Sequence, residues 1–484
     1  MTNTTAQKAI QLLQETFSAA QVLLPSIEEY TTLNGSYLSA LESDLTPACI
    51  FQPRSAEEVS QFVKTLVPLG VPFAVRGAGQ QPLPGCANID GGITLDLGLL
   101  TGVKINENES VSVAAGERWG TVYDALSSQN LGVCGARSSK GGIGGLALSG
   151  GLSFFSSREG LISDNILNYE IILASGAIVQ ANATDNPSLW TALRGGGNNF
   201  GIVTRFDLRT FPQDSFWAGV TYYFPASFPA QIEALVQELQ NPGAEAPDTH
   251  YMISTGYAAM MGGAMCMNQV YYTGASDAQQ QPPAVLQRFS TAIEPQVPQI
   301  SSVAVQSLSQ AAQGQAAAAM DQLRCAYFNT TVKADADTLK AAADLYMAAL
   351  EPIHGVEGLI CSLTLQPYPT SLLEKSEQQG GNSLGLTAAE GPLVSLLLLS
   401  YWKNSSDDAA VLGVMQTALA KIKAEATARG QHVPFEFLNY AWSSQDPFAS
   451  YGSENKSQLQ AVSREFDPEG VFQKLVPGGF KLFA

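Results

Sequence analysis

The sequence of 484 residues predicts an α+β fold with more than one domain. Three observations lead to this prediction. Glycine-rich blocks at 76–81, 132–151 and 194–201 are separated by strand-like segments. From 214 to 432, helical and strand-like segments alternate, which is typical of a second α+β domain. Finally, 45% of the residues are hydrophobic and only 14% are charged, so a chain of this length can bury a large core.

The first elements follow from local signals. Met1–Glu15 has the apolar spacing of an amphipathic helix. The segment Ser55-Ala56-Glu57-Glu58 has the pattern of a capping box, so we expect a helix from about residue 55 to 68. Short apolar strands are predicted at Val71–Val75 and Ile93–Leu97, on either side of the first glycine block.

Later elements are predicted by the same periodicities. We expect a hairpin from Ile166 to Ala181 that turns at Ser175-Gly176, and a strand at Ile202–Leu208. In the second domain we predict helices at Ala230–Leu239, Ala312–Leu323, Leu339–Leu350 and Asp407–Ala428. Strands are predicted there at Tyr251–Ser254, Ala264–Tyr272, Leu359–Leu365 and Leu393–Trp402. From Phe435 onward we expect short strands and turns, with Val433–Trp442 as a strand.

Composition excludes several classes of protein. The net charge of −18 disfavours a nucleic-acid partner, because phosphate binding needs a basic face. No apolar run reaches ~18 residues, so no membrane partner is expected. The start of the chain has no pattern of a signal peptide, which predicts a cytoplasmic protein. The six cysteines contain no C-x-x-C and the three histidines lie far apart, so we expect free buried thiols and no metal site.

The glycine blocks suggest one extended ligand that is bound by backbone. Glycine allows close approach and positive φ, and successive exposed N–H groups form a nest for a pyrophosphate. None of the blocks fits G-x-G-x-x-G between a strand and a helix, so an NAD-type site is not expected. The alternative is that each block forms only a tight turn.

The motifs taken together resemble a known family. The chain resembles the berberine-bridge-enzyme-like FAD-linked oxidoreductases, in particular their fungal secondary-metabolism branch. The segments that carry the resemblance are Ala192–Thr204, which includes Arg194-Gly195-Gly196-Gly197, and then Gly380-Gly381-Asn382, Asn439-Tyr440 and Asp467-Pro468.

The resemblance implies the fold of the vanillyl-alcohol-oxidase and p-cresol-methylhydroxylase (PCMH) group. It predicts an N-terminal helical segment at 1–44 and a two-subdomain FAD-binding domain at 45–212. A substrate domain with an antiparallel sheet is expected at 213–432, and the segment 433–484 is expected to complete the FAD-binding domain.

The resemblance also implies which residues contact FAD. The implied set is Arg76, Gly77, Ala78, Gly79, Gln80, Gln81, Ser138, Gly142, Gly144, Gly145, Ser149, Gly150, Gly151, Gly160, Asp164, Asn165, Gly201, Ile202, Val203, Asn439 and Tyr440. Two of these depart from the family. Gln80 stands where members usually carry a flavin-linking histidine, and Ser138 stands where many carry a flavin-linking cysteine. Cys134 is four residues away from that position and is a poor substitute, so we expect FAD to be bound non-covalently.

Two enzymatic functions follow from the loss of both links. The first is an FAD-dependent oxidase of a small hydrophobic natural-product intermediate, with O₂ as electron acceptor. The second is a non-redox cyclase, of the pericyclase or Diels–Alderase kind, or an isomerase, on the same scaffold with structural or absent flavin. A non-catalytic binding protein is a third interpretation.

Candidate substrate and catalytic residues lie in two segments. Met252, Met265 and Met267 belong to a cluster of five methionines between 252 and 267, which is typical of a plastic apolar wall or of core packing. If Val433–Trp442 is a strand, its alternation places Glu436, Tyr440 and Trp442 on one face. Tyr440 faces the flavin by resemblance, so we expect Glu436 and Tyr440 to be catalytic and Trp442 to line the pocket. The alternative for Glu436 is a solvated edge carboxylate.

Overall fold

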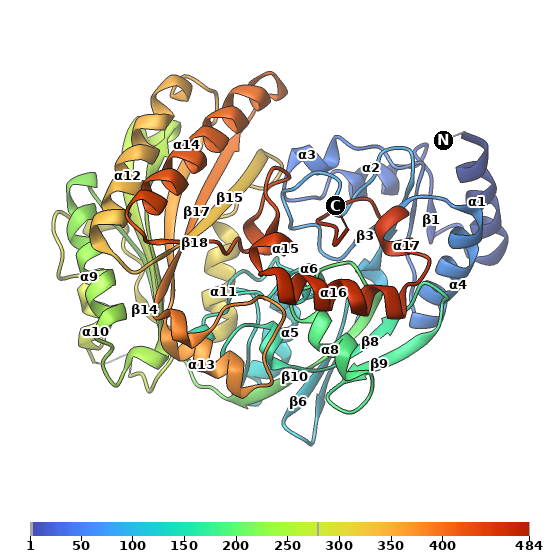
Figure 1. Cartoon of the computed structure of the whole chain (residues 1–484), viewed down its shortest axis with the longest axis horizontal. Helices are drawn as coiled ribbons and strands as arrows, with labels where there is room; N and C mark the ends of the chain where they lie inside the picture. Colours follow the sequence, from blue (N-terminus) through green and yellow to red (C-terminus); the bar gives the residue numbers. More distant parts are fainter. Residues whose placement is uncertain (1–2, 278–279, 484) are drawn as a thin grey trace.

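The computed structural model describes residues 3–277 and 280–483, which are arranged around three sheets (Figure 1). The first sheet has the order β1-β2-β4-β3, with β2, β4 and β3 parallel and β1 antiparallel to β2. Its strands and the helices of the same part of the chain are β1 (Val22–Leu23), β2 (Cys49–Phe51), β3 (Phe73–Arg76), β4 (Ile93–Asp96), α1 (Asn3–Thr16), α2 (Glu28–Asn34), α3 (Ala40–Ser43) and α4 (Ala56–Leu66).

The start of α4 confirms half of the predicted capping box. The hydroxyl of Ser55 accepts a hydrogen bond from the backbone N–H of Glu58 at 3.3 Å. The Glu58 carboxylate does not bond back to Ser55. It accepts the Arg54 backbone N–H and the Gln21 amide, both at 2.7 Å. Glu58 therefore ties the helix to the chain before β2 as well as stabilising its first turn.

The second sheet has six antiparallel strands. Its order is β5-β6-β10-β8-β9, with β7 paired to β10. The predicted hairpin is confirmed, with Ile172 paired to Ile178 and Gly176 at a φ of 77° in the turn. The elements of this part are β5 (Val103–Asn106), β6 (Ser110–Ala114), α5 (Trp119–Ser127), β7 (Leu131–Val133), α6 (Gly144–Leu148), α7 (Ser156–Glu159), β8 (Ile166–Ile172), β9 (Ile178–Asn182), α8 (Pro187–Leu193) and β10 (Ile202–Pro212).

The third sheet has eight antiparallel strands in the order β14-β11-β13-β12-β16-β17-β15-β18. Its elements are β11 (Phe216–Tyr223), α9 (Phe228–Gln240), β12 (Thr249–Ala258), β13 (Gly263–Tyr272), α10 (Ala284–Ser290), β14 (Ala304–Gln306), α11 (Leu308–Ala317), β15 (Arg324–Lys333), α12 (Ala336–Leu350), β16 (Ile360–Tyr368), α13 (Thr370–Gln378), β17 (Leu393–Trp402), α14 (Asp408–Ala428) and β18 (His432–Val433). Helices α9, α10, α12 and α14 cover its outer face, at the left of Figure 1.

Strand alternation divides the third sheet between two cores. In β12, Tyr251 and Ile253 pack in the core beneath the covering helices. Met252, between them, belongs to the core of the N-terminal part of the chain. The face that carries Met252 therefore looks toward the first two sheets, as the two-residue period of a strand requires.

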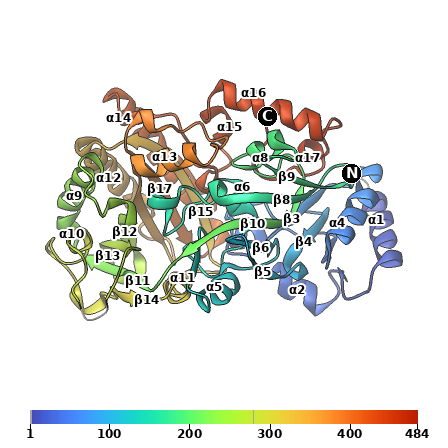
Figure 2. The same cartoon turned by 90° about the horizontal axis from the view of Figure 1, so that it is seen from below.

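Two predictions for the C-terminal region are wrong. The strand expected at Val433–Trp442 ends at Val433, because Pro434 cannot donate to a sheet ladder, and a 3₁₀ turn follows at Leu438–Tyr440. Beyond it the chain is helical, with α15 (Pro447–Ser450), α16 (Ser453–Phe466) and α17 (Val471–Lys474). Helix α16 packs beside α8, which returns the end of the chain to its N-terminal half (Figure 2).

The predicted helix at Ala312–Leu323 is displaced. Helix α11 begins at Leu308 because Ser307 and Gln310 form a complete capping box. It ends at Ala317, and β15, which the periodicity did not predict, follows at Arg324.

Candidate functional site

The three glycine blocks meet in space, as the single-ligand interpretation predicts. A Cβ placed on Gly142 would lie 2.6 Å from the Cβ of Ala78, so the first and second blocks are in contact. The backbone N–H groups of Gly195 and Gly197 both donate to the carbonyl of Leu148, at 3.2 and 3.0 Å. The third block is thus anchored to the second.

The C-terminal segment contacts the same region through Asn439. Its Oδ1 accepts the backbone N–H of Gly151 at 3.2 Å, and its Nδ2 donates to the Leu146 carbonyl at 3.3 Å. The sequence motif Asn439-Tyr440 is thereby held against the second glycine block.

The backbone between these contacts is open. A Cβ placed on Gly144 or Gly145 would meet no atom within 4 Å. Gly79, Gly150 and Gly151 have φ values of 66°, 104° and 76°, which L-residues with side chains rarely adopt. The open backbone at Gly144 and Gly145 fits the close approach of a flat dinucleotide whose pyrophosphate accepts N–H groups. Within the described residues, no cluster of three His, Cys, Asp or Glu side chains could hold a metal ion.

Arg76 lies at the edge of this region, but its side chain is already engaged. It is 2% exposed, and its Nε lies 3.2 Å from Asp96 Oδ2. Nη1 donates to the Leu33 carbonyl at 2.7 Å, and the guanidinium stacks on Tyr37. These contacts leave the backbone of 77–81 as the donor surface of the first loop, and they disfavour the predicted contact of Arg76 with a phosphate.

Gln80 and Ser138, which the resemblance places at the flavin-linking positions, are both half-buried. Cys134 is fully buried, and burial raises the pKa of its thiol well above the ordinary value. All six cysteines are free, as predicted.

Other predicted cofactor residues support the loops. The Asp164 carboxylate accepts the Leu161 N–H and the Asn382 amide, both at 2.8 Å. Asn165 donates to the carbonyls of Glu159 and Leu161. Through Asp164, these hydrogen bonds connect the loop around Gly160 to residues 376–382. Strand β10 begins with Ile202 and Val203, directly after Gly201. Ser149 is the C-cap residue of α6.

The sequence analysis missed a polar cluster centred on Arg137. Its Nη1 lies 3.0 Å from His250 Nε2, 3.0 Å from Gln366 Oε1 and 2.6 Å from Met252 Sδ. Its Nη2 donates to the Tyr440 oxygen at 2.8 Å, and that hydroxyl donates to Gln366 Oε1 at 3.2 Å. Two local signals pointed to it. Arg137 precedes Ser138, and His250 alternates with Met252 along β12.

Arg137 is the positively charged member of this cluster, and its partner His250 is neutral. Burial, with a further contribution from Arg137, holds the pKa of His250 well below its usual 6.5. The neutral imidazole then accepts at Nε2, because an arginine can only donate, and its proton lies on Nδ1.

The structure separates Glu436 and Trp442 from Tyr440. Glu436 forms an ion pair with Lys423 and accepts the Asp446 backbone N–H at 3.1 Å. Trp442 packs on Phe328 in the core beneath the helices, with ring centroids 5.5 Å apart. The two methionines Met265 and Met267 are half-buried on β13. Met260 and Met261, also in the methionine cluster, are exposed at a turn.

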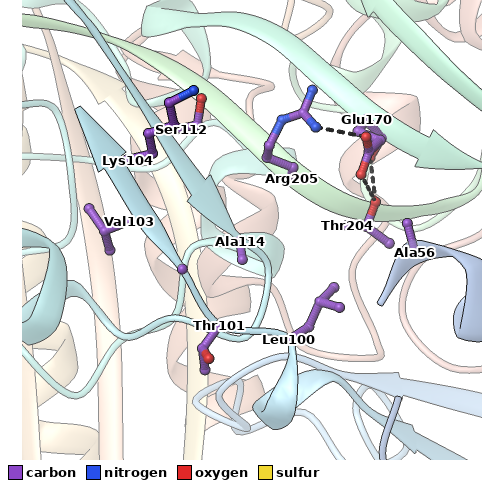
Figure 3. Close-up of a pocket in the computed structure, with 11 residues that line it drawn as sticks. Ala56, Leu100, Thr101, Val103, Lys104, Ser112, Ala114, Glu170, Thr204 and Arg205 are labelled. Carbon is purple, nitrogen blue, oxygen red and sulfur yellow. Dashed lines mark hydrogen bonds and ion pairs between the residues drawn. The ribbon is translucent and has the colours of Figure 1, made fainter. Parts of the chain in front are cut away.

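A groove of about 570 Å³ lies elsewhere, against β5, β6 and the start of β10 (Figure 3). Within it, Glu170 accepts from Arg205 at 2.7 Å and from the Thr204 hydroxyl at 2.9 Å. Its lining contains no member of the Arg137 cluster and no predicted cofactor residue. The groove is therefore not part of the site described above.

Comparison with known proteins defines the family. Residues 47–182 match the FAD binding domain family. An FAD-dependent monooxygenase of Fusarium proliferatum is 36% identical over 457 residues, which cover 92% of this chain and 87% of that protein. The bifunctional solanapyrone synthase of Alternaria solani is 31% identical, with 98% and 89% covered. The chain therefore belongs to the berberine-bridge-enzyme-like family of FAD-linked oxidoreductases.

Solved structures show the same fold. BBE-like 1 of Physcomitrella patens superposes with a TM-score of 0.76 at 20% identity, over 100% of this chain and 99% of that chain. Glucooligosaccharide oxidase of Acremonium strictum, which carries a 6-S-cysteinyl, 8α-N1-histidyl FAD, superposes with a TM-score of 0.77 at 20% identity, over 96% and 97%. Within the described ranges, this fold contains no helix with the length and apolarity that a membrane crossing needs.

Proposed function

We propose that the protein is an FAD-dependent oxidase of a small hydrophobic natural-product intermediate, that FAD is bound non-covalently, and that O₂ accepts the electrons. The observation that carries this proposal is the Arg137 cluster. It joins the second glycine block, the third sheet and the C-terminal segment, and Arg137 is adjacent to Ser138, at the position of a flavin link in relatives. The relatives named FAD-dependent monooxygenases support the same class of chemistry.

We assign separate roles to the backbone of the glycine blocks and to the side chain of Tyr440. Backbone N–H groups of 77–81 and 142–145, with Asn439, would hold FAD, which supplies hydride acceptance when bound. The hydroxyl of Tyr440 accepts a hydrogen bond from Arg137 and donates one to Gln366, and these two bonds fix the orientation of the hydroxyl. A fixed phenol of this kind can exchange a proton with a substrate hydroxyl, as general acid–base catalysis requires.

Non-covalent binding follows from the residues at the two linking positions. Neither the amide of Gln80 nor the hydroxyl of Ser138 is a nucleophile comparable to an imidazole or a thiolate. Cys134, the nearest thiol in sequence, is fully buried. The backbone contacts of the glycine blocks therefore carry the affinity for FAD.

A non-redox cyclase or isomerase is the second candidate function. One observation favours it: Arg137 and Tyr440 present an N–H cation and an O–H group that could polarise a carbonyl without any flavin. A relative named as bifunctional is compatible with chemistry beyond oxidation.

One experiment separates the two functions. Purified holoenzyme is mixed anaerobically with a panel of benzylic and allylic alcohols and phenols while the flavin spectrum and the products are followed. Bleaching that O₂ reverses, with stoichiometric O₂ consumption, supports the oxidase. Turnover without bleaching and without O₂ demand would replace it with the cyclase or isomerase.

A further inference from the structure

The guanidinium of Arg137 is surrounded by uncharged partners. It contacts a neutral imidazole, an amide oxygen, a thioether and a phenol, from His250, Gln366, Met252 and Tyr440. Among residues 3–277 and 280–483, no carboxylate forms an ion pair with it. A cation placed among groups that cannot neutralise it is unfavourable unless something else supplies negative charge.

Two fully buried arginines, Arg76 and Arg194, are satisfied within the protein. Arg76 is buried against Asp96. Arg194 contacts no carboxylate directly, but it is 1% exposed and donates to three backbone carbonyls, those of Ile166, Gln379 and Gly381. Arg137 differs from both because it is only half-buried, and it differs from Arg76 also because it has no acidic partner. Its environment remains open to a ligand.

The guanidinium also keeps donor capacity. It has five N–H groups. The contacts to the protein involve Nη1 and Nη2, and the described part of the chain offers no hydrogen-bond partner to Nε. Residues from three segments hold the group in place, so a ligand oxygen would meet preoriented charged donors.

The face of the third sheet beside the cluster carries two methionines among polar side chains. Along β12, His250, Met252 and Ser254 share the face that looks toward the first two sheets. Met267 of β13 pairs with Ser254 and is half-buried. A cation beside apolar side chains such as those of Met252 and Met267 is common in small-molecule sites, where a few polar groups fix the orientation of an apolar ligand.

We infer that Arg137 is the counterion of an ionised substrate oxygen, so the substrate is an acidic small molecule with an apolar body. The oxygen belongs to a carboxylate, a phenolate or the enolate of a 1,3-dicarbonyl, all of which accept charge-assisted hydrogen bonds from a guanidinium. This substrate class rests on the proposed function, because it places the substrate beside Tyr440.

The test measures binding, not turnover. Calorimetry of the purified holoenzyme compares three matched pairs of probes: cinnamate with cinnamamide, 4-nitrophenolate with 4-nitroanisole, and the dimedone enolate with 3,3-dimethylcyclohexanone. We expect at least one anion to bind ~10-fold or more tightly than its neutral partner, the scale of one charge-assisted hydrogen bond. The pair with the largest ratio identifies the oxygen.

Three variants complete the test. Arg137→Met should remove the anion preference, and Arg137→Lys should retain part of it because the charge remains without the planar fork. Arg205→Met, which removes one cation from the groove of the second sheet, should leave the ratio unchanged.

Equal binding of anions and neutral partners in the wild type would overturn the inference, as would an anion preference that survives Arg137→Met with unchanged flavin content and Tm. The oxidase assay is a separate outcome. An anion preference without flavin bleaching by any substrate would leave the substrate class standing and remove the proposed oxidase, and the reverse result would do the opposite.

Discussion

The Nη2 of Arg137 donates to the phenolic oxygen of Tyr440 at 2.8 Å, although 303 residues separate the two in sequence. The bond joins the second glycine block to the C-terminal segment, next to His250 and Gln366 of the third sheet. Both residues also contact Gln366 Oε1, so the three side chains form a closed triangle. Tyr440 therefore belongs to the Arg137 cluster, whereas Glu436, the other predicted catalytic residue, pairs with Lys423 outside it.

Tyr440→Phe should lower kcat by ~10²-fold, the usual scale for loss of a general acid or base. The ring still packs on Phe437, so flavin content and Tm should stay within error of the wild type. Steady-state kinetics with the best substrate of the panel provides the measurement. The control is Tyr346→Phe, which removes a hydroxyl in α12 beneath the sheet. Unchanged kcat in Tyr440→Phe would exclude the phenol from proton transfer.

Glu436→Gln should lower stability and leave kcat within about 3-fold of the wild type. The sequence predicted a catalytic carboxylate, but the carboxylate contacts Lys423 and the Asp446 N–H. Loss of hydrogen bonds to a charged group costs about 2 kcal/mol in such positions. Urea unfolding measures the change, and Lys423→Met should show a similar loss. A ~10²-fold fall in kcat without a loss of stability would restore Glu436 as an acid–base candidate.

Acid precipitation should release all flavin from the protein. Gln80 and Ser138 offer no linking nucleophile, so the supernatant is expected to be yellow and the pellet colourless. Absorbance of both fractions gives the flavin ratio directly. A pellet that keeps its yellow colour after washing in denaturant would show a covalent bond at some other residue.

Gly145→Val should reduce FAD occupancy without unfolding the protein. No atom lies within 4 Å of the Cβ position of Gly145, so the side chain enters open space that a bound dinucleotide would share. Occupancy is measured from the ratio of flavin to protein absorbance. Gly243→Val, at an equally open position outside the glycine blocks, is the matched control. Full occupancy in Gly145→Val would place the cofactor elsewhere.

Stability should fall as pH rises through neutrality, with Glu42 as one cause. Burial raises the pKa of this carboxyl to about 7, although it accepts backbone N–H groups of Gly85 and Ala87. The folded state then binds a proton that the unfolded state releases near pH 4.5, so this contribution is complete below pH 4.5 and is lost as pH rises through 7. The change is about 3 kcal/mol at most. Urea unfolding between pH 5 and 8.5 should show a smaller decline for Glu42→Gln, and parallel curves would exclude Glu42.

Local signals in the sequence determined much of the fold. The Ser55 cap, the Ser175-Gly176 turn and the apolar periods of α9, α12 and α14 each act within a few residues, and the structure confirms all of them. The glycine blocks and the Asn439-Tyr440 motif also led to the correct family. Pro434 is also a local signal: it ends β18 at Val433, so the strand predicted at Val433–Trp442 is wrong.

The Arg137 cluster was decided by tertiary structure alone. Arg137 is 113 residues from His250 and 229 from Gln366. It lies between β7 and α6, whereas His250 and Gln366 lie on strands whose local pattern says only that one face is buried. Which strands become neighbours depends on the order β12-β16 in the third sheet and on how that sheet meets the glycine blocks. Periodicity fixes the face on which a side chain lies, whereas the partner it meets there depends on long-range packing between segments that no local pattern relates.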